Sequence, residues 1–562
     1  MKKPIITIVI VIMVFIIGWV GYKRLWKDTD TLQEETPTPT GSVFPSPTGS
    51  LPLPTVTASP EVSDTELYPA YQETNGQKSY GYIDGGGNFV IQPVYGSASD
   101  FTDGVAVVQD LSLSKVIDRN GNVLFENEDV ISAYSNGAAV FTKTVGTTRL
   151  SGYIDTEGKV IIEPNYILAD NFNQDNKAYV STETGKYALI DKSGNILESY
   201  ELASNYDTVI AFQDGYVLYT DPVSKKTGVV TVGGEQLYEP IYSDINYLGS
   251  DRFAVVTSPV EFYELLWAPC AIFNKEGVRL TEDTLYDLSN YNGEFASATD
   301  SKYTYFVELD GKEVTTLPKV EGRGTLTMLG DIIKANIDQE IIYMRKDGSV
   351  LWQNDKTAYL DNGISVKAVK FKSNKYVLVN YPQVEGLADL EVQNLINEQL
   401  KGFFTDARVN LKEKDMLSVE DTFSAQLLNG LLILQKKGYD YPFGAAHGMP
   451  IREYYHIDIK TGDFYQLSDL FKEGSDYVTK LNMLLKSQID EQSKASDTFL
   501  FPDSFQGISE NQGFIIAKDA LIIYFTPYEI AAYAAGFPKF KIPYDDIKDL
   551  INDSGVFWKS FH

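Results

Sequence analysis

The sequence predicts a mainly β repeat domain followed by a C-terminal α+β domain. A short phrase recurs eight times between residues 67 and 355, at a period of about 37 residues. After that point the period stops and apolar residues recur at helical spacing. A charge-free apolar segment and a proline-rich segment precede both domains. The predicted order is a cytoplasmic tip (1–4), a transmembrane anchor (5–22), a stalk (23–66), the repeat domain (67–355) and the C-terminal domain (364–551).

The segment from Ile5 to Tyr22 contains no charged residue and follows Lys2 and Lys3. Its length matches the roughly 20 apolar residues that a helix needs to cross a bilayer core. The apolar region of a cleaved secretion signal is shorter, at about 7–15 residues. We therefore predict a retained signal-anchor, and a cleaved signal is the alternative interpretation.

The stalk indicates on which side of the membrane the remaining chain lies. Residues 36–60 contain seven prolines, a composition that favours extended polyproline conformations over a packed core. At about 3.1 Å per residue this segment reaches on the order of 70–80 Å. A spacer of that length suits a cell wall, so the prediction is a single-pass membrane protein of a Gram-positive bacterium. Its N-terminus is cytoplasmic and its C-terminal domains are extracytoplasmic.

Composition excludes several classes of protein. The chain has one cysteine, Cys270, so it contains no intrachain disulfide scaffold. Its formal net charge of −29 disfavours nucleic acid, whose affinity comes mainly from phosphate neutralisation. The same charge favours cationic partners or divalent ions, and maintenance of solubility is the alternative interpretation. No nucleic acid is expected to bind, and no cofactor or specific metal site is predicted.

The repeated phrase is a pair of apolar residues, an aspartate, two spacers and a glycine. Its clearest copies begin at Tyr82, Val116, Tyr153 and Leu189, and four weaker copies follow. The Asp-x-x-Gly step is typical of a β-hairpin turn, because aspartate caps the turn and glycine adopts positive φ. We therefore interpret the repeated aspartates, glycines and aromatic residues as structural.

Each repeat is long enough for the three or four short strands of a propeller blade. The expected architecture is a β-propeller-like array of seven or eight repeats. An open β superhelix is the alternative, since repeats contact only their neighbours in either geometry.

The phrases Tyr80-Gly81-Tyr82-Ile83-Asp84 and Ser151-Gly152-Tyr153-Ile154-Asp155 resemble the WG repeat family. Tyrosine or a smaller residue stands where that family has tryptophan. The resemblance covers roughly residues 67–355 and implies repeat architecture rather than a particular activity.

The C-terminal region carries three distinctive phrases. They are Gly444–Gly448 followed by Tyr454–Asp458, Thr461–Asp463 followed by Leu467–Phe471, and Phe525–Gly536 followed by Ile542–Tyr544. Together they resemble the paired extracytoplasmic domains of RsiV-type anti-sigma factors and PdaC-type peptidoglycan deacetylases. The resemblance to the RsiV-type anti-sigma factors implies a domain that binds lysozyme. The metal signature of the deacetylases has no counterpart in this sequence.

Catalytic motifs are not found in the sequence, so no catalytic residue is predicted. Of its three histidines, His447 lies in a Gly/Ala loop near Tyr441, which makes this pair a candidate ligand-binding site. Tyr528 and Tyr533 are candidate anchors for a protein partner, because tyrosine commonly supplies binding hot spots. Structural roles are the alternative for all four residues.

The sequence therefore predicts a non-catalytic binding or sensor protein of the cell envelope. Its expected partners are an envelope protein, including a lysozyme-like cationic protein, or peptidoglycan, and its helix contacts the membrane. The alternatives are a hydrolase of wall polymers, with its site near Tyr441 and His447, and a structural scaffold.

The anchor and stalk generate a prediction about topology. Protease added to intact protoplasts should release a soluble fragment of roughly 500 residues, because an extended stalk is accessible to proteases. The measurement is an immunoblot of supernatant and membrane fractions, with a cytoplasmic protein as the control for lysis. Full protection of the chain would place the domains in the cytoplasm.

Overall fold

The computed structural model describes residues 66–562, apart from 75–76, 111–112, 184, 202–207, 261–263, 266–267, 495–499, 502 and 510. These residues form two compact units. The larger contains 66–475, 516–519 and 548–562, and the smaller contains 476–515 and 520–547. The predicted boundary between 355 and 364 lies inside the larger unit, and the predicted domain bounds stay a prediction.

The predicted anchor and all of the predicted stalk except Glu66 lie outside the described residues. In the part of the chain that the structure describes, no helix has the length and apolar character needed to cross a bilayer.

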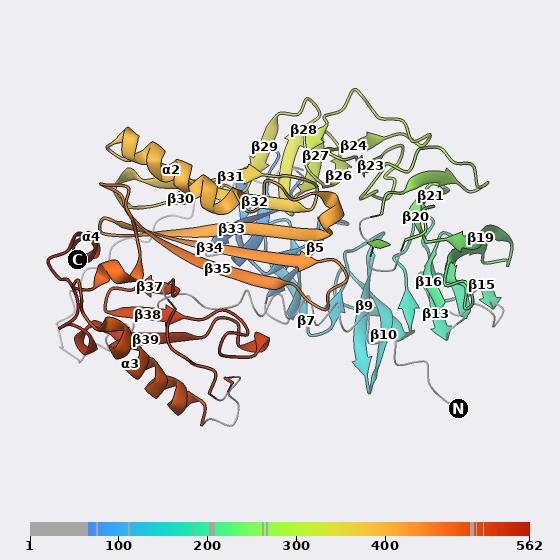
Figure 1. The fold of residues 1–562 in the computed structure, drawn as a ribbon. Helices are drawn as coiled ribbons and strands as arrows, with labels where there is room; N and C mark the ends of the chain where they lie inside the picture. Colours follow the sequence, from blue (N-terminus) through green and yellow to red (C-terminus); the bar gives the residue numbers. More distant parts are fainter. Residues whose placement is uncertain are drawn as a thin grey trace, which may run out of the picture. The chain divides into compact units, whose positions relative to one another are not determined.

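Within the described ranges, eight small antiparallel sheets follow one another over residues 68–353 (Figure 1), and in each the strand order follows the chain. The first four consist of β1 (Tyr68–Thr74), β2 (Gln77–Ile83) and β3 (Phe89–Tyr95); β4 (Ser97–Ala98), β5 (Val105–Asp110), β6 (Leu113–Asp118) and β7 (Val123–Asn127); β8 (Val130–Ile131), β9 (Ala138–Val145), β10 (Thr148–Asp155) and β11 (Val160–Tyr166); and β12 (Leu168–Ala169), β13 (Lys177–Glu183), β14 (Lys186–Asp191) and β15 (Ile196–Glu201). The last four consist of β16 (Thr208–Gln213), β17 (Tyr216–Thr220), β18 (Thr227–Thr231) and β19 (Gln236–Tyr242); β20 (Asp244–Gly249), β21 (Arg252–Val256) and β22 (Ala271–Asn274); β23 (Ala296–Thr299), β24 (Tyr303–Val307) and β25 (Val320–Glu321); and β26 (Gly324–Leu329), β27 (Ile332–Ile337), β28 (Glu340–Arg345) and β29 (Val350–Gln353).

The repeated Asp-x-x-Gly step forms the hairpin turn that the sequence predicts. In the first copy, one carboxylate oxygen of Asp84 accepts hydrogen bonds from the backbone N–H groups of Gly86 and Asn88, at 2.8 and 2.9 Å. Gly87 has a φ of 84°. Glycine at position 81 has a different cause, because a Cβ there would lie 2.3 Å from the carbonyl oxygen of Ile91. The phrase therefore encodes turn geometry and close strand packing.

Neighbouring sheets are joined by shared apolar clusters. Each consecutive pair of sheets contributes buried residues to one common cluster. The first and eighth sheets also share one, in which Tyr68, Ala70 and Ile83 pack against Ile332 and Tyr343. The order of contacts along the repeats therefore returns to its starting sheet.

Buried tyrosine hydroxyls add a polar bond between sheets. Tyr82 donates to the carbonyl oxygen of Ser99 at 2.9 Å, and Tyr153 donates to that of Asp170 at 2.7 Å. Both acceptors belong to the following repeat. Tyr343 occupies the same position of the phrase in the eighth sheet, and it donates to the carbonyl oxygen of Pro69 in the first sheet at 2.8 Å.

A seven-stranded sheet follows the repeats in the larger unit, with strand order β30 to β36. Its elements are β30 (Ala358–Tyr359), η2 (Asp361–Gly363), β31 (Ser365–Phe371), β32 (Val377–Glu385), α2 (Leu390–Thr405), η3 (Glu413–Asp415), β33 (Leu417–Leu428), β34 (Leu431–Pro442), β35 (Met449–Asp458) and β36 (Phe464–Tyr465). Only the β32 and β33 pair is parallel. Helix α2 supplies that crossover and lies along the sheet (Figure 1), where Ile396 and Leu400 are buried against it. Asp389 caps the helix N-terminus.

The turn between β27 and β28 contacts the seven-stranded sheet. The carboxylate of Asp338 accepts from the ammonium groups of Lys370 and Lys372, at 2.9 and 2.8 Å. Burial alone would raise the pKa of Asp338, but the hydrogen bonds from these two lysines hold it below its ordinary value. The side chain of Gln339 donates to Glu420 in β33. The eighth small sheet is therefore bonded to the seven-stranded sheet.

The rest of the C-terminal region is divided between the units. The larger unit has η4 (Leu467–Leu470) and α4 (Val556–Phe561). The smaller unit has α3 (Tyr477–Gln492), η5 (Tyr533–Ala535), η6 (Tyr544–Asp546) and most of the sheet of β37 (Phe514–Ile516), β38 (Ala520–Tyr524) and β39 (Lys539–Pro543). Helix α3 contacts β39, and Gln488 donates to the carbonyl oxygen of Lys541 at 3.0 Å.

The predicted mainly β repeat domain is confirmed. The helical spacing predicted after the repeats corresponds to α2 and α3. The α+β classification of the C-terminal region stays a prediction.

We predict that Tyr343→Phe loosens the first sheet. The variant removes the hydrogen bond to the buried carbonyl of Pro69, and an unsatisfied buried acceptor lowers the folding stability by about 1–3 kcal/mol. Amide exchange within β1 should accelerate about 5–30-fold, the factor for one or two kcal/mol. The measurement is hydrogen exchange with mass spectrometry.

Tyr82→Phe is the matched control, because it removes the same kind of bond to Ser99. It should accelerate exchange around β4 and β5 and leave β1 unchanged. Unchanged exchange of β1 in Tyr343→Phe would contradict the role assigned to this hydroxyl.

Candidate functional site

The structure places Tyr441 and His447 on one hairpin. Tyr441 is near the end of β34, and His447 lies in the loop before β35. The hydroxyl of Tyr441 donates to the carbonyl oxygen of Ala445 at 3.1 Å. The imidazole of His447 is exposed, and its Nδ1 lies 2.9 Å from the carbonyl oxygen of Gly448. Both side chains therefore contact their own loop.

Tyr439 supports this loop and was not identified from the sequence. Its hydroxyl accepts a hydrogen bond from the backbone N–H of Gly448 at 2.9 Å. A Cβ at position 448 would lie 2.7 Å from the Tyr439 ring and 2.6 Å from the carbonyl oxygen of Asp440. The glycine after His447 is therefore required by packing, which the spacing of the Gly/Ala loop alone does not reveal.

Tyr528 and Tyr533 lie together on one turn of the smaller unit. Their ring centroids are 5.8 Å apart. Tyr528 is 49% exposed, and its backbone has a φ of 69°, which is strained for a bulky residue. Its N–H donates to the carbonyl oxygen of Ala531 at 3.0 Å. Strain combined with an exposed aromatic ring is a reason to consider a functional role for this turn.

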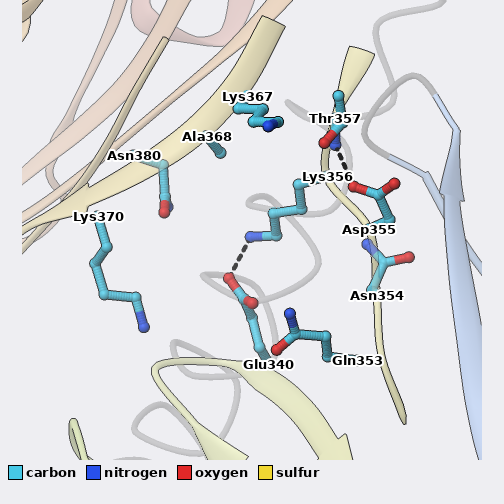
Figure 2. A pocket seen from close by; sticks show the side chains of 10 residues that line it. All are labelled: Glu340, Gln353, Asn354, Asp355, Lys356, Thr357, Lys367, Ala368, Lys370 and Asn380. Carbon is cyan, nitrogen blue, oxygen red and sulfur yellow. Dashed lines mark hydrogen bonds and ion pairs between the residues drawn. The ribbon is translucent and has the colours of Figure 1, made fainter. Parts of the chain in front are cut away.

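A polar pocket lies in the larger unit, where the eighth small sheet meets the seven-stranded sheet (Figure 2). Its volume is about 320 Å³. The residues that line it are Glu340, Gln353, Asn354, Asp355, Lys356, Thr357, Lys367, Ala368, Lys370 and Asn380. None of them is a histidine, cysteine or serine.

Ion pairs hold the lysines of this pocket. Lys356 bonds to Glu340 inside the pocket (Figure 2). Lys367 lies 2.6 Å from the carboxylate of Glu385, and Lys370 donates to Asp338. The pocket therefore presents ammonium groups in fixed positions.

A buried ionic network lies on the seven-stranded sheet. The guanidinium of Arg408 makes two bonds of 2.8 Å to Asp440 and one of 3.2 Å to Asp421. Lys436 lies 4.0 Å from Asp421 and donates to the carbonyl oxygen of Phe403. Burial raises the pKa of Asp421. The positive and negative charges of these side chains offset one another, so we assign this network a structural role.

His456 is fully buried, and burial lowers its pKa to about 3. Its Nε2 accepts from the backbone N–H of Ile516 at 3.3 Å. A neutral, buried imidazole with this role is structural rather than catalytic. Among the described residues, no group of three or more His, Cys, Asp or Glu side chains is arranged to hold a metal ion.

Comparison with known families identifies two kinds of module. Residues 80–110 and 152–187 match the family described as WG containing repeat. Residues 468–545 match the family described as Protein of unknown function (DUF3298). The chain therefore carries WG repeats in its N-terminal half and a DUF3298 segment near its C-terminus, as the resemblances predicted.

Two curated relatives are similar to parts of this chain. Over 210 residues it is 25% identical to Anti-sigma-V factor RsiV of Bacillus subtilis (strain 168), which covers 34% of this chain and 72% of the relative. Over 120 residues it is 28% identical to Peptidoglycan-N-acetylmuramic acid deacetylase PdaC of the same organism. That alignment covers 21% of this chain and 26% of the deacetylase, so most of the deacetylase has no counterpart in it.

Solved structures of the DUF3298 family also match. A member from Bacteroides fragilis nctc 9343 aligns with 37% of this chain and 98% of its own, at 17% identity and a TM-score of 0.29. A family protein from Pseudomonas aeruginosa PAO1 aligns with 34% and 94%, at 20% identity and a TM-score of 0.25.

The buried His456 generates a prediction about pH. Below its ordinary pKa of 6.5 the unfolded chain binds a proton that the folded chain does not bind. Folding stability should therefore fall as pH decreases from about 6.5 toward 3, at up to about 1.4 kcal/mol per pH unit from this group.

The measurement is urea unfolding between pH 7.5 and 5.5. His456→Gln should show a flatter dependence than the unmodified protein, and His447→Gln, which changes an exposed histidine, should not. NMR provides a second test, since the His456 ring signals should stay constant down to pH 5. A titration near pH 6.5 would contradict the burial argument.

Proposed function

We propose that this protein binds a protein or cell-wall ligand in the bacterial envelope without catalysing a reaction. The polar pocket is the observation that carries this proposal. It combines a volume of about 320 Å³ with lysine, amide and carboxylate side chains. Such a lining suits recognition of a polar ligand.

The extracytoplasmic location is part of the proposal. The apolar segment 5–22 and the proline-rich stalk support a membrane anchor followed by a spacer. The similarity to RsiV and PdaC supports the envelope, because the name of the second relative describes peptidoglycan chemistry. The match to PdaC covers only 26% of that protein, so its activity is not transferred to this chain.

We also propose that the eight small sheets form a closed β-propeller rather than an open superhelix. The apolar cluster shared by the first and eighth sheets supports closure. So does the bond from Tyr343 to Pro69, since tyrosines at the same position elsewhere bond to the next repeat. An open array would leave both terminal sheets without a neighbour.

A lysozyme-like cationic protein is the proposed partner. The resemblance to RsiV-type domains motivates this choice, and the net charge of −29 would accelerate the encounter with a basic protein. Charge attracts any basic protein, so specificity must come from buried contacts. The exposed ring of Tyr528, packed on Tyr533, is the proposed anchor.

A titration of the full-length protein with lysozyme tests this proposal. We expect saturable binding at physiological salt and at least about thirtyfold weaker binding for Tyr528→Ala, because losing a hot spot costs about 2 kcal/mol or more. The measurement is isothermal calorimetry at two salt concentrations. Binding that disappears at physiological salt would reduce the interaction to nonspecific attraction.

Ile241→Ala is the control, because Ile241 is another exposed apolar side chain and lies in the larger unit outside the pocket lining. It should bind normally. Weaker binding of Ile241→Ala together with normal binding of Tyr528→Ala would contradict the proposed anchor.

The alternative function is a hydrolase of wall polymers, favoured by the exposed imidazole of His447 beside Tyr441 on one loop. Incubation of the protein with peptidoglycan distinguishes the two functions. Soluble product that His447→Ala fails to release would replace the binding proposal with the enzyme.

A further inference from the structure

The pocket in Figure 2 offers more hydrogen-bond donors than its own acceptors use. An ammonium group has three N–H donors. Among the described residues, Lys356, Lys367 and Lys370 each bond to one carboxylate, which leaves donors on each of them.

The carboxylates of the lining already make hydrogen bonds within the chain. One oxygen of Asp355 accepts from the N–H of Thr357 at 2.9 Å, and the other accepts from the hydroxyl of Tyr359 at 2.8 Å. Glu340 bonds to Lys356. The lysine donors that these bonds leave unused are open to a ligand.

Asn354 is the second, independent observation. Its amide nitrogen is buried and has no hydrogen-bond partner among the described residues. In Figure 2 this nitrogen points toward the side of the pocket where the ammonium group of Lys356 lies. A buried donor without a partner costs about 1–3 kcal/mol, so its presence beside a pocket points to a ligand that supplies the acceptor.

We propose that this pocket binds the carboxylate group of a small polar molecule. The inference rests on the proposed binding function and adds the chemical class of the ligand. A carboxylate is acceptor-only and offers about four lone-pair sites, which suits the donors of Asn354 and Lys356. Each lysine already shares its charge with a carboxylate, so the pocket suits a singly charged group better than a phosphate dianion.

The pocket also limits the size of the ligand. A volume of about 320 Å³ is at the small end of ligand sites, where a monosaccharide or a dipeptide fits. Sugar acids and peptide C-termini both present a carboxylate at this size. The carboxylate is therefore the group that both kinds of ligand share, and the experiment distinguishes a sugar acid from a peptide C-terminus.

Two matched pairs of probes test the inference on the full-length protein. In the first pair, D-glucuronate carries a carboxylate that glucose lacks. In the second pair, alanyl-alanine carries a C-terminal carboxylate that its C-terminal amide lacks. We expect at least one acid to bind, and its neutral counterpart to bind at least about tenfold more weakly, by calorimetry or ligand-detected NMR. Inorganic phosphate should bind more weakly than that acid.

Substitutions locate the binding. Asn354→Asp keeps the shape of the side chain but replaces its donors with a like charge, so binding of the acid should fall at least about tenfold. Lys356→Gln removes the other proposed donor and should also weaken binding. Lys346→Gln is the control, because Lys346 forms an ion pair with Asp331 outside the lining.

Three outcomes would overturn the inference: failure of both acids to bind, equal binding of an acid and its neutral counterpart, or unchanged binding by both pocket variants. The melting temperature of each variant verifies that it is folded. The lysozyme titration is independent of these probes. If lysozyme binds and no acid does, the envelope-binding proposal stands and the carboxylate inference fails.

Discussion

Packing of each small sheet against the next is the constraint on which this structure depends. A sheet of three or four short strands cannot bury a core alone, so its inner face must be covered by a neighbour. Shared clusters supply that cover along the whole series, and Tyr68, Ala70 and Ile83 meet the eighth sheet in the same way. The buried hydroxyls of Tyr82, Tyr153 and Tyr343 satisfy carbonyl groups across these contacts.

The eighth sheet has a second role because its turn reaches the seven-stranded sheet. Asp338 receives two lysines there, and Gln339 bonds to Glu420. Burial raises the pKa of Glu420, although the bond from Gln339 opposes that shift. The connector that follows β29 runs between these elements and carries Asn354 and Lys356 into the pocket. The contact that joins the two sheets therefore also shapes the candidate ligand site.

Local features of the fold were predictable, and those of the site were not. The turns of Asp84 and its equivalents depend on bonds within five residues, so the phrase predicts them. The pairing of Tyr441 with His447 on one loop, and of Tyr528 with Tyr533 on one turn, also follows from short spacing. The pocket has no sequence signal, because Glu340, Asn354 and Asn380 lie on separate elements and none belongs to a motif.

The sequence by itself determined the repeat period, the turn chemistry, the helical segments and the two family resemblances. Each of these depends on residues close together in the chain, where propensity and spacing act directly. Only the tertiary structure decided that the first sheet packs on the eighth, that Asp338 binds two distant lysines, and that a buried amide faces a pocket. These depend on contacts between residues that lie far apart in the chain, and a periodic pattern contains no information about which distant surfaces meet.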